Sequence, residues 1–273
     1  MSDKAKRDYW IKLMDKAYGF MQKAAQYPVV ESLEPMVSIE EVFSAAKADV
    51  ILSDKPFPSK GLSRIFYLRE SVAHDLVEAA LEFNRHGFKL IIEDAFRSYQ
   101  MQKEIALSEK VFKVILDKVV WELEGATPEP EHMLKRITAL SATFPRIGTH
   151  MSGSAVDISV MDISSGLILD RGGDYIELSE KTPMASPFIS DVAKSNRQKI
   201  TDTMTKFGFV PYPYEFWHYS KGDVFGEYLT DSGEDAIYGA VDLDLKTGQV
   251  TPIAEPMKSL HSLENIAAKI LAG

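Results

Sequence analysis

Residues 149–157 read Thr-His-Met-Ser-Gly-Ser-Ala-Val-Asp, and about sixty residues later positions 214–219 read Tyr-Glu-Phe-Trp-His-Tyr. The two stretches supply two histidines and a carboxylate, a common catalytic zinc set that leaves a fourth coordination position for water or substrate. We therefore predict that His150, Asp157 and His218 bind one zinc ion and that Glu215 acts on a water molecule bound to it. The rest of the chain is interpreted as the scaffold that brings these four side chains together.

The segment that contains these first two ligands changes from a loop to a strand. Pro145 and Gly148 precede His150, which favours a loop that can be shaped around a metal. From Ala155 onward, strand alternation places Asp157 on one face and the branched apolar side chains on the other. An acidic side chain with apolar strand neighbours is costly to bury unless it is paired or bound to a metal.

Each of the four side chains also has an ordinary structural explanation. His150 could be a hydrogen-bonded loop histidine, and Asp157 could cap a turn or pair with an arginine. His218 could be a core histidine among its aromatic neighbours, and Glu215 could be a solvated loop carboxylate. On a regular strand Glu215 and His218 would face opposite ways, so they can share a site only if the backbone turns or bulges between them.

The composition limits the class of protein. The chain of 273 residues has a formal net charge of -9, is 45% hydrophobic and contains no cysteine. The acidic balance argues against nucleic acid as the main partner, and the lack of cysteine excludes disulfides and restricts metal ligands to nitrogen and oxygen. The N-terminus lacks the continuous apolar segment of a secretory signal, and no apolar run approaches the roughly 20 residues that span a bilayer. We therefore expect a cytoplasmic protein without a membrane span.

Hydrophobic periodicity predicts an α+β fold, in which a small antiparallel sheet carries the zinc site and is flanked by helices. We expect one domain over residues 1–273, with a core at about 64–222, a helical N-terminal extension at 1–63 and a hairpin–helix C-terminal extension at 223–273. The N-terminal helix is expected to pack on the domain or on a partner subunit of a homo-oligomer. The predicted helices cover about 4–27, 64–85, 100–123, 131–142, 191–207 and 259–271, and the predicted strands cover 47–52, 88–93 and 155–160, with hairpins around 163–167 and 240–253.

Three separated motifs together resemble the zinc D-alanyl-D-alanine dipeptidases and the related D,D- and L,D-carboxypeptidases, which are LAS-type metallopeptidases. The first motif runs from His150 to Asp157, with Gly153 and Ala155 between them and the family's spacing of seven from histidine to aspartate. The second is Glu-Phe-Trp-His at 215–218, which matches the family's Glu-x-Trp-His. The third is Asp-Ala-Phe-Arg at 94–97, with phenylalanine where the family has tyrosine. The resemblance covers about residues 64–222, and this group shares its fold with lysostaphin-type peptidases and hedgehog domains.

The resemblance implies metal-assisted peptide hydrolysis. Zinc would lower the pKa of its water and polarise the scissile carbonyl. Glu215 would take the proton of this water and pass it to the leaving amine, and Arg97 would stabilise the oxyanion that develops. The alternative for Arg97 is a salt bridge with Asp94 or Glu93.

The resemblance also implies contacts with the substrate. Asp174 falls where dipeptidases of this group place a carboxylate for the substrate ammonium, although it could instead be a turn aspartate. If Asp174 has this role, the substrate needs a free N-terminus and the enzyme is a dipeptidase. Ser152, Ser154 and Tyr219 are expected to line the pocket.

Three functions are compatible with these patterns. The leading hypothesis is zinc-dependent hydrolysis of D-Ala-D-Ala or a related D-amino-acid dipeptide, which a cytoplasmic location favours over cell-wall polymer. The second is a D,D- or L,D-carboxypeptidase that acts on peptidoglycan precursors or fragments. The third is a non-catalytic zinc-stabilised binding module, which the hedgehog domains show to be compatible with the fold. Glu215 and Arg97 argue against the third hypothesis, because a purely structural site needs neither.

Overall fold

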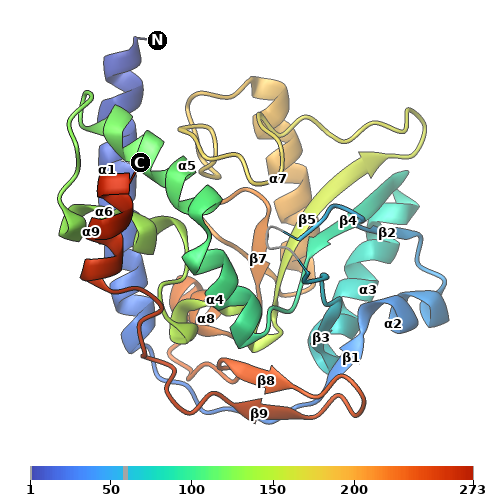
Figure 1. The fold of residues 1–273 in the computed structure, drawn as a ribbon. Helices are drawn as coiled ribbons and strands as arrows, with labels where there is room; N and C mark the ends of the chain where they lie inside the picture. Colours follow the sequence, from blue (N-terminus) through green and yellow to red (C-terminus); the bar gives the residue numbers. More distant parts are fainter. Residues whose placement is uncertain (1, 58–60, 273) are drawn as a thin grey trace.

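A five-stranded mixed sheet lies at the centre of the structure, a computed structural model that describes residues 2–57 and 61–272 (Figure 1). The strand order is β2-β4-β5-β7-β6, with the bounds Val50–Leu52, Phe88–Asp94, Ala155–Asp162, His218–Ser220 and Val210–Pro211. β2 and β4 are parallel because α3 (Glu70–Arg85) carries the chain back between them, and the other neighbouring pairs are antiparallel. The predicted α+β class is confirmed, whereas the sheet is mixed rather than wholly antiparallel.

One face of the sheet is buried against two helices. Alternate residues of β5, Ile158 among them, belong to a core that also contains Leu76 of α3 and Ile200 of α7 (Asp191–Lys206). α2 (Ile39–Ala46) covers the outer side of α3. Strand alternation turns Asp157 to the opposite face, as predicted, and the candidate site is therefore on the side away from this core.

Four helices form a second layer, which Figure 1 shows to the left of the sheet. They are α1 (Asp3–Gln26), α5 (Glu109–Glu122), α6 (Pro130–Leu140) and α9 (Leu263–Ala272). α1 and α9 both pack on α6, and the buried Trp10 of α1 donates a hydrogen bond from Nε1 to Glu122 at 3.2 Å. The predicted N-terminal helix is therefore confirmed and packs on its own domain.

Several boundaries differ from the prediction. The segment predicted as one helix at 100–123 forms two, α4 (Tyr99–Leu107) and α5, because the Ser108 hydroxyl accepts from Val111 N and starts a new helix. The last helix begins at Leu263 rather than at 259. The sequence patterns did not reveal α8 (Val224–Thr230), which is capped by Asp223.

A segment from the N-terminal part of the chain and one from the C-terminal part meet beside the central sheet. The N-terminal extension predicted at 1–63, of which residues 1 and 58–60 lie outside the described chain, also contains α2 and β1 (Met36–Ser38), which the sequence patterns did not predict. β1 pairs with β3 (Tyr67–Arg69), which replaces the start of the helix predicted from residue 64. β8 (Val241–Leu243) and β9 (Val250–Pro252) form the predicted hairpin, and Met36 N donates to Gly248 O at 2.8 Å.

No helix in the described part of the chain is long and apolar enough to cross a membrane.

Candidate functional site

Neighbouring strands bring the two sequence motifs together. β5 and β7 are antiparallel, and their register pairs Asp157 directly with His218. His150 lies in η2 (Thr149–Ser152), a 3-10 turn that precedes β5 and follows η1 (Pro145–Ile147). Gly153 ends η2 with a φ of 72°, a left-handed conformation that glycine adopts without strain. The potential ligand atoms of the two histidines and the aspartate all lie within 4.8 Å of one another, and the three side chains are buried.

The hydrogen bonds of His150 turn its free nitrogen toward Asp157. Nδ1 lies 2.6 Å from the carbonyl oxygen of Ala95, which can only accept, so Nδ1 carries a proton. In the neutral imidazole Nε2 is then an acceptor, and it faces Asp157 Oδ1 at 3.2 Å. Two acceptors at this distance require a proton or a cation between them. A histidine that donates its outer N–H to a backbone carbonyl is typical of metal ligands.

His218 approaches the same carboxylate oxygen from the other side. Its Nδ1 lies 3.0 Å from Asp157 Oδ1, and its Nε2 lies 3.1 Å from Thr149 Oγ1 and 3.2 Å from Ser220 Oγ. When Nε2 donates to either hydroxyl, Nδ1 presents a lone pair toward the aspartate. Two inward imidazole nitrogens and one carboxylate oxygen are a donor set that fits a divalent metal such as zinc.

The second oxygen of Asp157 is held by protein groups. The Tyr175 hydroxyl donates to Oδ2 at 2.9 Å, and Arg97 Nη2 lies 3.5 Å from the same oxygen. Burial alone would raise the pKa of Asp157, but the two imidazoles lower it well below its usual range. Burial and this carboxylate raise the pKa of Tyr175 well above its usual value, so the hydroxyl remains a donor. The sequence motifs do not contain Tyr175, and only its position next to Asp174 pointed to this loop.

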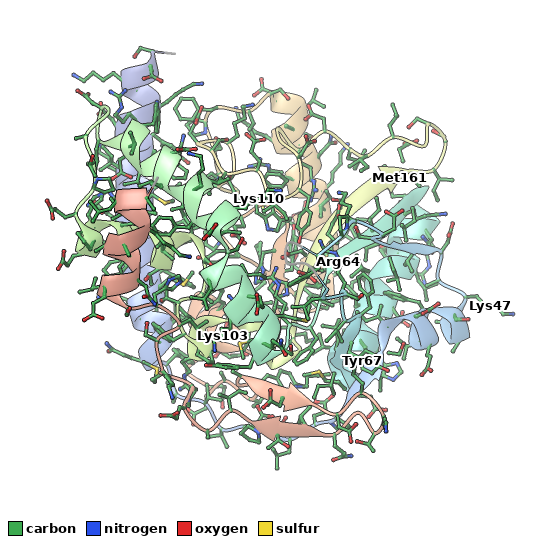
Figure 2. All side chains as sticks on the ribbon, viewed as in Figure 1. Lys47, Arg64, Tyr67, Lys103, Lys110 and Met161 are labelled. Carbon is green, nitrogen blue, oxygen red and sulfur yellow. The ribbon has the colours of Figure 1, made fainter. Side chains whose placement is uncertain are left out.

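Arg97 is fixed at the end of β4. Its Nε donates to Asp94 Oδ2 at 2.9 Å, and Asp94 Oδ1 lies 3.1 Å from Nη1 of Arg64, which Figure 2 labels. Burial alone would lower the pKa of Arg97, but the carboxylates of Asp94 and Asp157 raise it above its usual value. The salt bridge with Asp94 that was the alternative for Arg97 is therefore present, and the guanidinium also lines the cavity described below.

The backbone turns between Glu215 and His218, which is the condition for both side chains to share a site. His218 N donates to Glu215 O at 3.3 Å and closes a turn immediately before β7. Both side chains line one cavity. Burial raises the pKa of Glu215 to about 7, and a carboxyl group with a pKa near neutral pH can both take up and release a proton.

A cavity of about 510 Å³ lies between the sheet and the helical layer. Its sheet side contains the three candidate ligands together with Arg97 and Glu215. Its opposite wall comes from α1, α4, α5 and α6, and residues 175–178 of the loop before α7 also line it. The volume lies in the range typical of small-molecule sites.

The cavity lining, as far as the chain is described, does not include Tyr219, Ser152 or Ser154. Strand alternation turns Tyr219 into the core on the opposite face of β7, where its hydroxyl lies 3.0 Å from Thr201 Oγ1. Ser152 is the last residue of η2 and Ser154 follows two positions later, and their hydroxyls are 2.7 Å apart. Ser154 also donates to the buried Asp223 at 3.2 Å. These serines stabilise the turn that carries the first histidine rather than the pocket.

The loop before α7 presents a different carboxylate to the cavity than the one predicted. Asp174 is exposed in a turn, and its backbone carbonyl accepts from Glu177 N at 3.1 Å. Glu177 lines the cavity, whereas Asp174 is not among the described residues that do so. Both acids lie in an irregular stretch without periodicity, so the sequence pattern could not indicate which of them faces inward.

Comparison with known proteins identifies the family of the chain. The profile of the peptidase M15 family, described as D-Ala-D-Ala dipeptidase, matches residues 60–232, which is more than half of the chain. The chain belongs to the D-Ala-D-Ala dipeptidase family. It is similar to the D-alanyl-D-alanine dipeptidase of Escherichia coli strain K12, with 29% identity over 133 residues that cover 49% of this chain and 55% of the relative. It is also similar to that of Synechocystis sp., with 25% identity over 201 residues that cover 65% of this chain and 80% of the relative. The chain thus spans about half the length of the E. coli relative.

Two solved structures show a weaker likeness. The LD-carboxypeptidase LdcB is 20% identical with a TM-score of 0.34, and the alignment covers 69% of this chain and 75% of that protein. A mutant of the vancomycin-resistance D,D-pentapeptidase VanY, in complex with Zn(II), is 16% identical with a TM-score of 0.35, and the alignment covers 70% of this chain and 97% of that protein. Membership of the D-Ala-D-Ala dipeptidase family rests on the sequence match. α1, β1 and the β8–β9 hairpin lie outside the matched segment.

Proposed function

We propose that the protein is a zinc-dependent dipeptidase that hydrolyses D-Ala-D-Ala or a related D-amino-acid dipeptide. The observation that carries the proposal is the convergence of His150, Asp157 and His218 with Glu215 and Arg97 around one cavity. Membership of the D-Ala-D-Ala dipeptidase family supports it. A metal site that only stabilises the fold needs neither a base nor a cation beside the ligands, which argues against a non-catalytic binding module.

Each of these side chains has a defined role in the proposal. His150 through Nε2, His218 through Nδ1 and Asp157 through Oδ1 would hold the zinc ion, which when bound polarises a scissile carbonyl and acidifies water. Glu215 accepts the proton of the attacking water at its carboxylate and delivers it to the leaving amine. The Arg97 guanidinium stabilises the negative charge that develops on the carbonyl oxygen.

Release of D-alanine from D-Ala-D-Ala, with the metal content measured on the same sample, tests the proposal. We expect about one zinc ion per chain and release that a chelator abolishes. Glu215→Gln keeps the shape of the side chain but cannot take a proton, so it should retain zinc and lose activity by roughly 100-fold or more. Glu78→Gln, at an exposed position of α3, is the control. Undiminished hydrolysis by Glu215→Gln would rule out Glu215 as the base.

The need for a free ammonium group on the substrate distinguishes a dipeptidase from a D,D-carboxypeptidase. In the loop before α7, Glu177 is the acidic residue that lines the cavity. We therefore assign the binding of the substrate ammonium to Glu177 in preference to Asp174. Glu177→Gln should raise the KM for D-Ala-D-Ala about tenfold or more, because a charge-assisted hydrogen bond is lost, whereas Asp174→Asn should not. N-acetyl-D-Ala-D-Ala lacks the ammonium, and its efficient hydrolysis would favour the carboxypeptidase instead.

A further inference from the structure

The cavity wall that faces the candidate ligands is mainly apolar. The side chains on this wall include Leu13 and Met14 of α1, Val111 and Ile115 of α5, and Leu140 of α6. The helices of this wall also present two polar side chains. The amide of Gln102 already donates to Ala142 O at 3.3 Å, and Lys110 of α5 is exposed. A ligand group that reaches this side of the cavity therefore meets mainly hydrocarbon, which favours an apolar group.

The cavity is also larger than an alanine dipeptide requires. Its volume is about 510 Å³, whereas a cavity of about 150 Å³ is enough for a benzene molecule. D-Ala-D-Ala has roughly twice as many non-hydrogen atoms as benzene and so fills about 300 Å³ by this measure. The remaining space matches one aromatic ring or one branched aliphatic side chain.

Part of the apolar wall lies outside the segment that the family profile matches. The match begins at residue 60, whereas Leu13 and Met14 belong to α1. The hydrogen bond from Trp10 to Glu122 of α5 fixes α1 in this position, and Met14 is 2% exposed. The family match consequently does not determine which part of a substrate contacts α1 in this protein.

We infer that the protein prefers dipeptides in which one residue carries a large apolar side chain, such as leucine or phenylalanine, over D-Ala-D-Ala. The inference rests on the proposed dipeptidase function and names the substrate class of the same site. The peptide bond lies beside Glu215 and Arg97, and the large side chain extends across the cavity to α1 and α5. Each additional buried methylene group should raise kcat/KM roughly fourfold.

The test compares kcat/KM of the zinc-loaded protein for D-Ala-D-Ala, D-Ala-D-Leu, D-Ala-D-Phe, D-Leu-D-Ala and D-Phe-D-Ala. We expect at least one bulky dipeptide to exceed D-Ala-D-Ala by more than about tenfold. If D-Ala-D-Ala is the best of these substrates, the inference is overturned and the dipeptidase function stands. If a chelator-sensitive activity is absent with all of them, the proposed function is overturned, and the inference with it.

Variants of the wall test the position of the large side chain. Val114 of α5 lines the cavity and is 48% exposed, so Val114→Trp can fill the cavity without disturbing the buried core. We expect the ratio of kcat/KM for the best bulky dipeptide to that for D-Ala-D-Ala to fall about fivefold or more. Leu13→Phe fills the same space from α1. Lys113→Trp, at the exposed neighbouring position, is the matched control and should leave the ratio unchanged. An unchanged ratio in both wall variants would overturn the assignment.

Discussion

The two carboxylate oxygens of Asp157 have different partners. Oδ1 faces the inward nitrogens of His150 and His218, whereas Oδ2 accepts from the Tyr175 hydroxyl. A carboxylate held in this way presents one oxygen to a metal and cannot rotate freely. Partners outside the ligand shell commonly change metal affinity by roughly 10–100-fold. The orientation of the predicted ligand therefore depends on a tyrosine that lies in none of the three motifs.

Tyr175→Phe removes this hydroxyl and keeps the ring that packs edge-on against Trp217 at a centroid distance of 5.7 Å. We expect the affinity for zinc to fall by about 10–100-fold, because Asp157 loses a donor that orients it. Competition with a chromophoric chelator measures this affinity. Tyr18→Phe removes a hydroxyl that accepts from Gln22 on α1 and serves as the control. Equal affinities in Tyr175→Phe and the wild type would mean that the tyrosine does not orient the aspartate.

α7 supports the loop that carries Tyr175 and Glu177 to the cavity. The buried Arg197 of this helix donates four hydrogen bonds to backbone carbonyls of the loop. The acceptors are the carbonyl oxygens of Arg171 at 2.7 Å, Pro183 at 2.6 Å, Lys181 at 2.8 Å and Met184 at 3.2 Å. Its guanidinium also lies over the ring of Phe216, 4.2 Å from the centroid. One side chain thus connects a helix, the cavity loop and the segment that contains Glu215.

Arg197→Lys keeps the positive charge but lacks the planar group that reaches four carbonyls. Unpaired buried carbonyls cost about 1–3 kcal/mol each, so we expect the free energy of unfolding to fall by about 2 kcal/mol or more. The amides of residues 171–188 should exchange faster, since the loop loses its support. Denaturant titration and hydrogen exchange measure the two effects. Lys199→Met, exposed on the same helix, should show neither, and unchanged exchange in Arg197→Lys would contradict the supporting role.

Local patterns predicted the elements that present the ligands but not the contacts between distant segments. Alternation around Asp157 predicted β5 and both of its faces, and apolar periodicity predicted α1 and α7. Ser108 interrupts the helix predicted at 100–123, because its side chain offers the backbone an alternative hydrogen bond. Tyr175 has no periodic neighbours, so its approach to Asp157 is a property of the folded chain alone.

Arg69 joins the N-terminal segment at Glu31 and the C-terminal segment at Tyr238 to the turn that carries His150. It is 0% exposed, its Nε donates to Ser152 O at 2.7 Å, and its Nη1 lies 2.9 Å from Glu31 Oε1. Its guanidinium also lies over the ring of Tyr238, 5.0 Å from the centroid. The N-terminal segment, the C-terminal segment and η2 therefore meet at one cation. The segments outside the family match are part of the support of the site.

Glu34 makes the stability of this junction dependent on pH. Ser71 N donates to its Oε1 at 2.6 Å, and the hydroxyls of Ser71 and Tyr238 donate to Oε2. Partial burial alone would raise the pKa of Glu34, but these hydrogen bonds lower it below its usual value of 4.5. A lowered folded-state pKa means that the carboxylate stabilises the folded protein fully above the unfolded-state value. This stabilisation is lost as the pH falls through the folded-state value.

Glu34→Gln should therefore lower the free energy of unfolding by about 1 kcal/mol near neutral pH, because three donors lose a charged acceptor that is partly exposed. The difference from the wild type should narrow as the pH falls below the ordinary value of 4.5, where the wild-type carboxylate itself becomes protonated. Urea unfolding at a series of pH values measures this difference. Glu78→Gln, at an exposed position of α3, should show no such narrowing. The free energies of unfolding of Glu34→Gln and the wild type could instead differ by a constant amount down to acid pH. The charge of Glu34 would then not hold the N-terminal and C-terminal segments together.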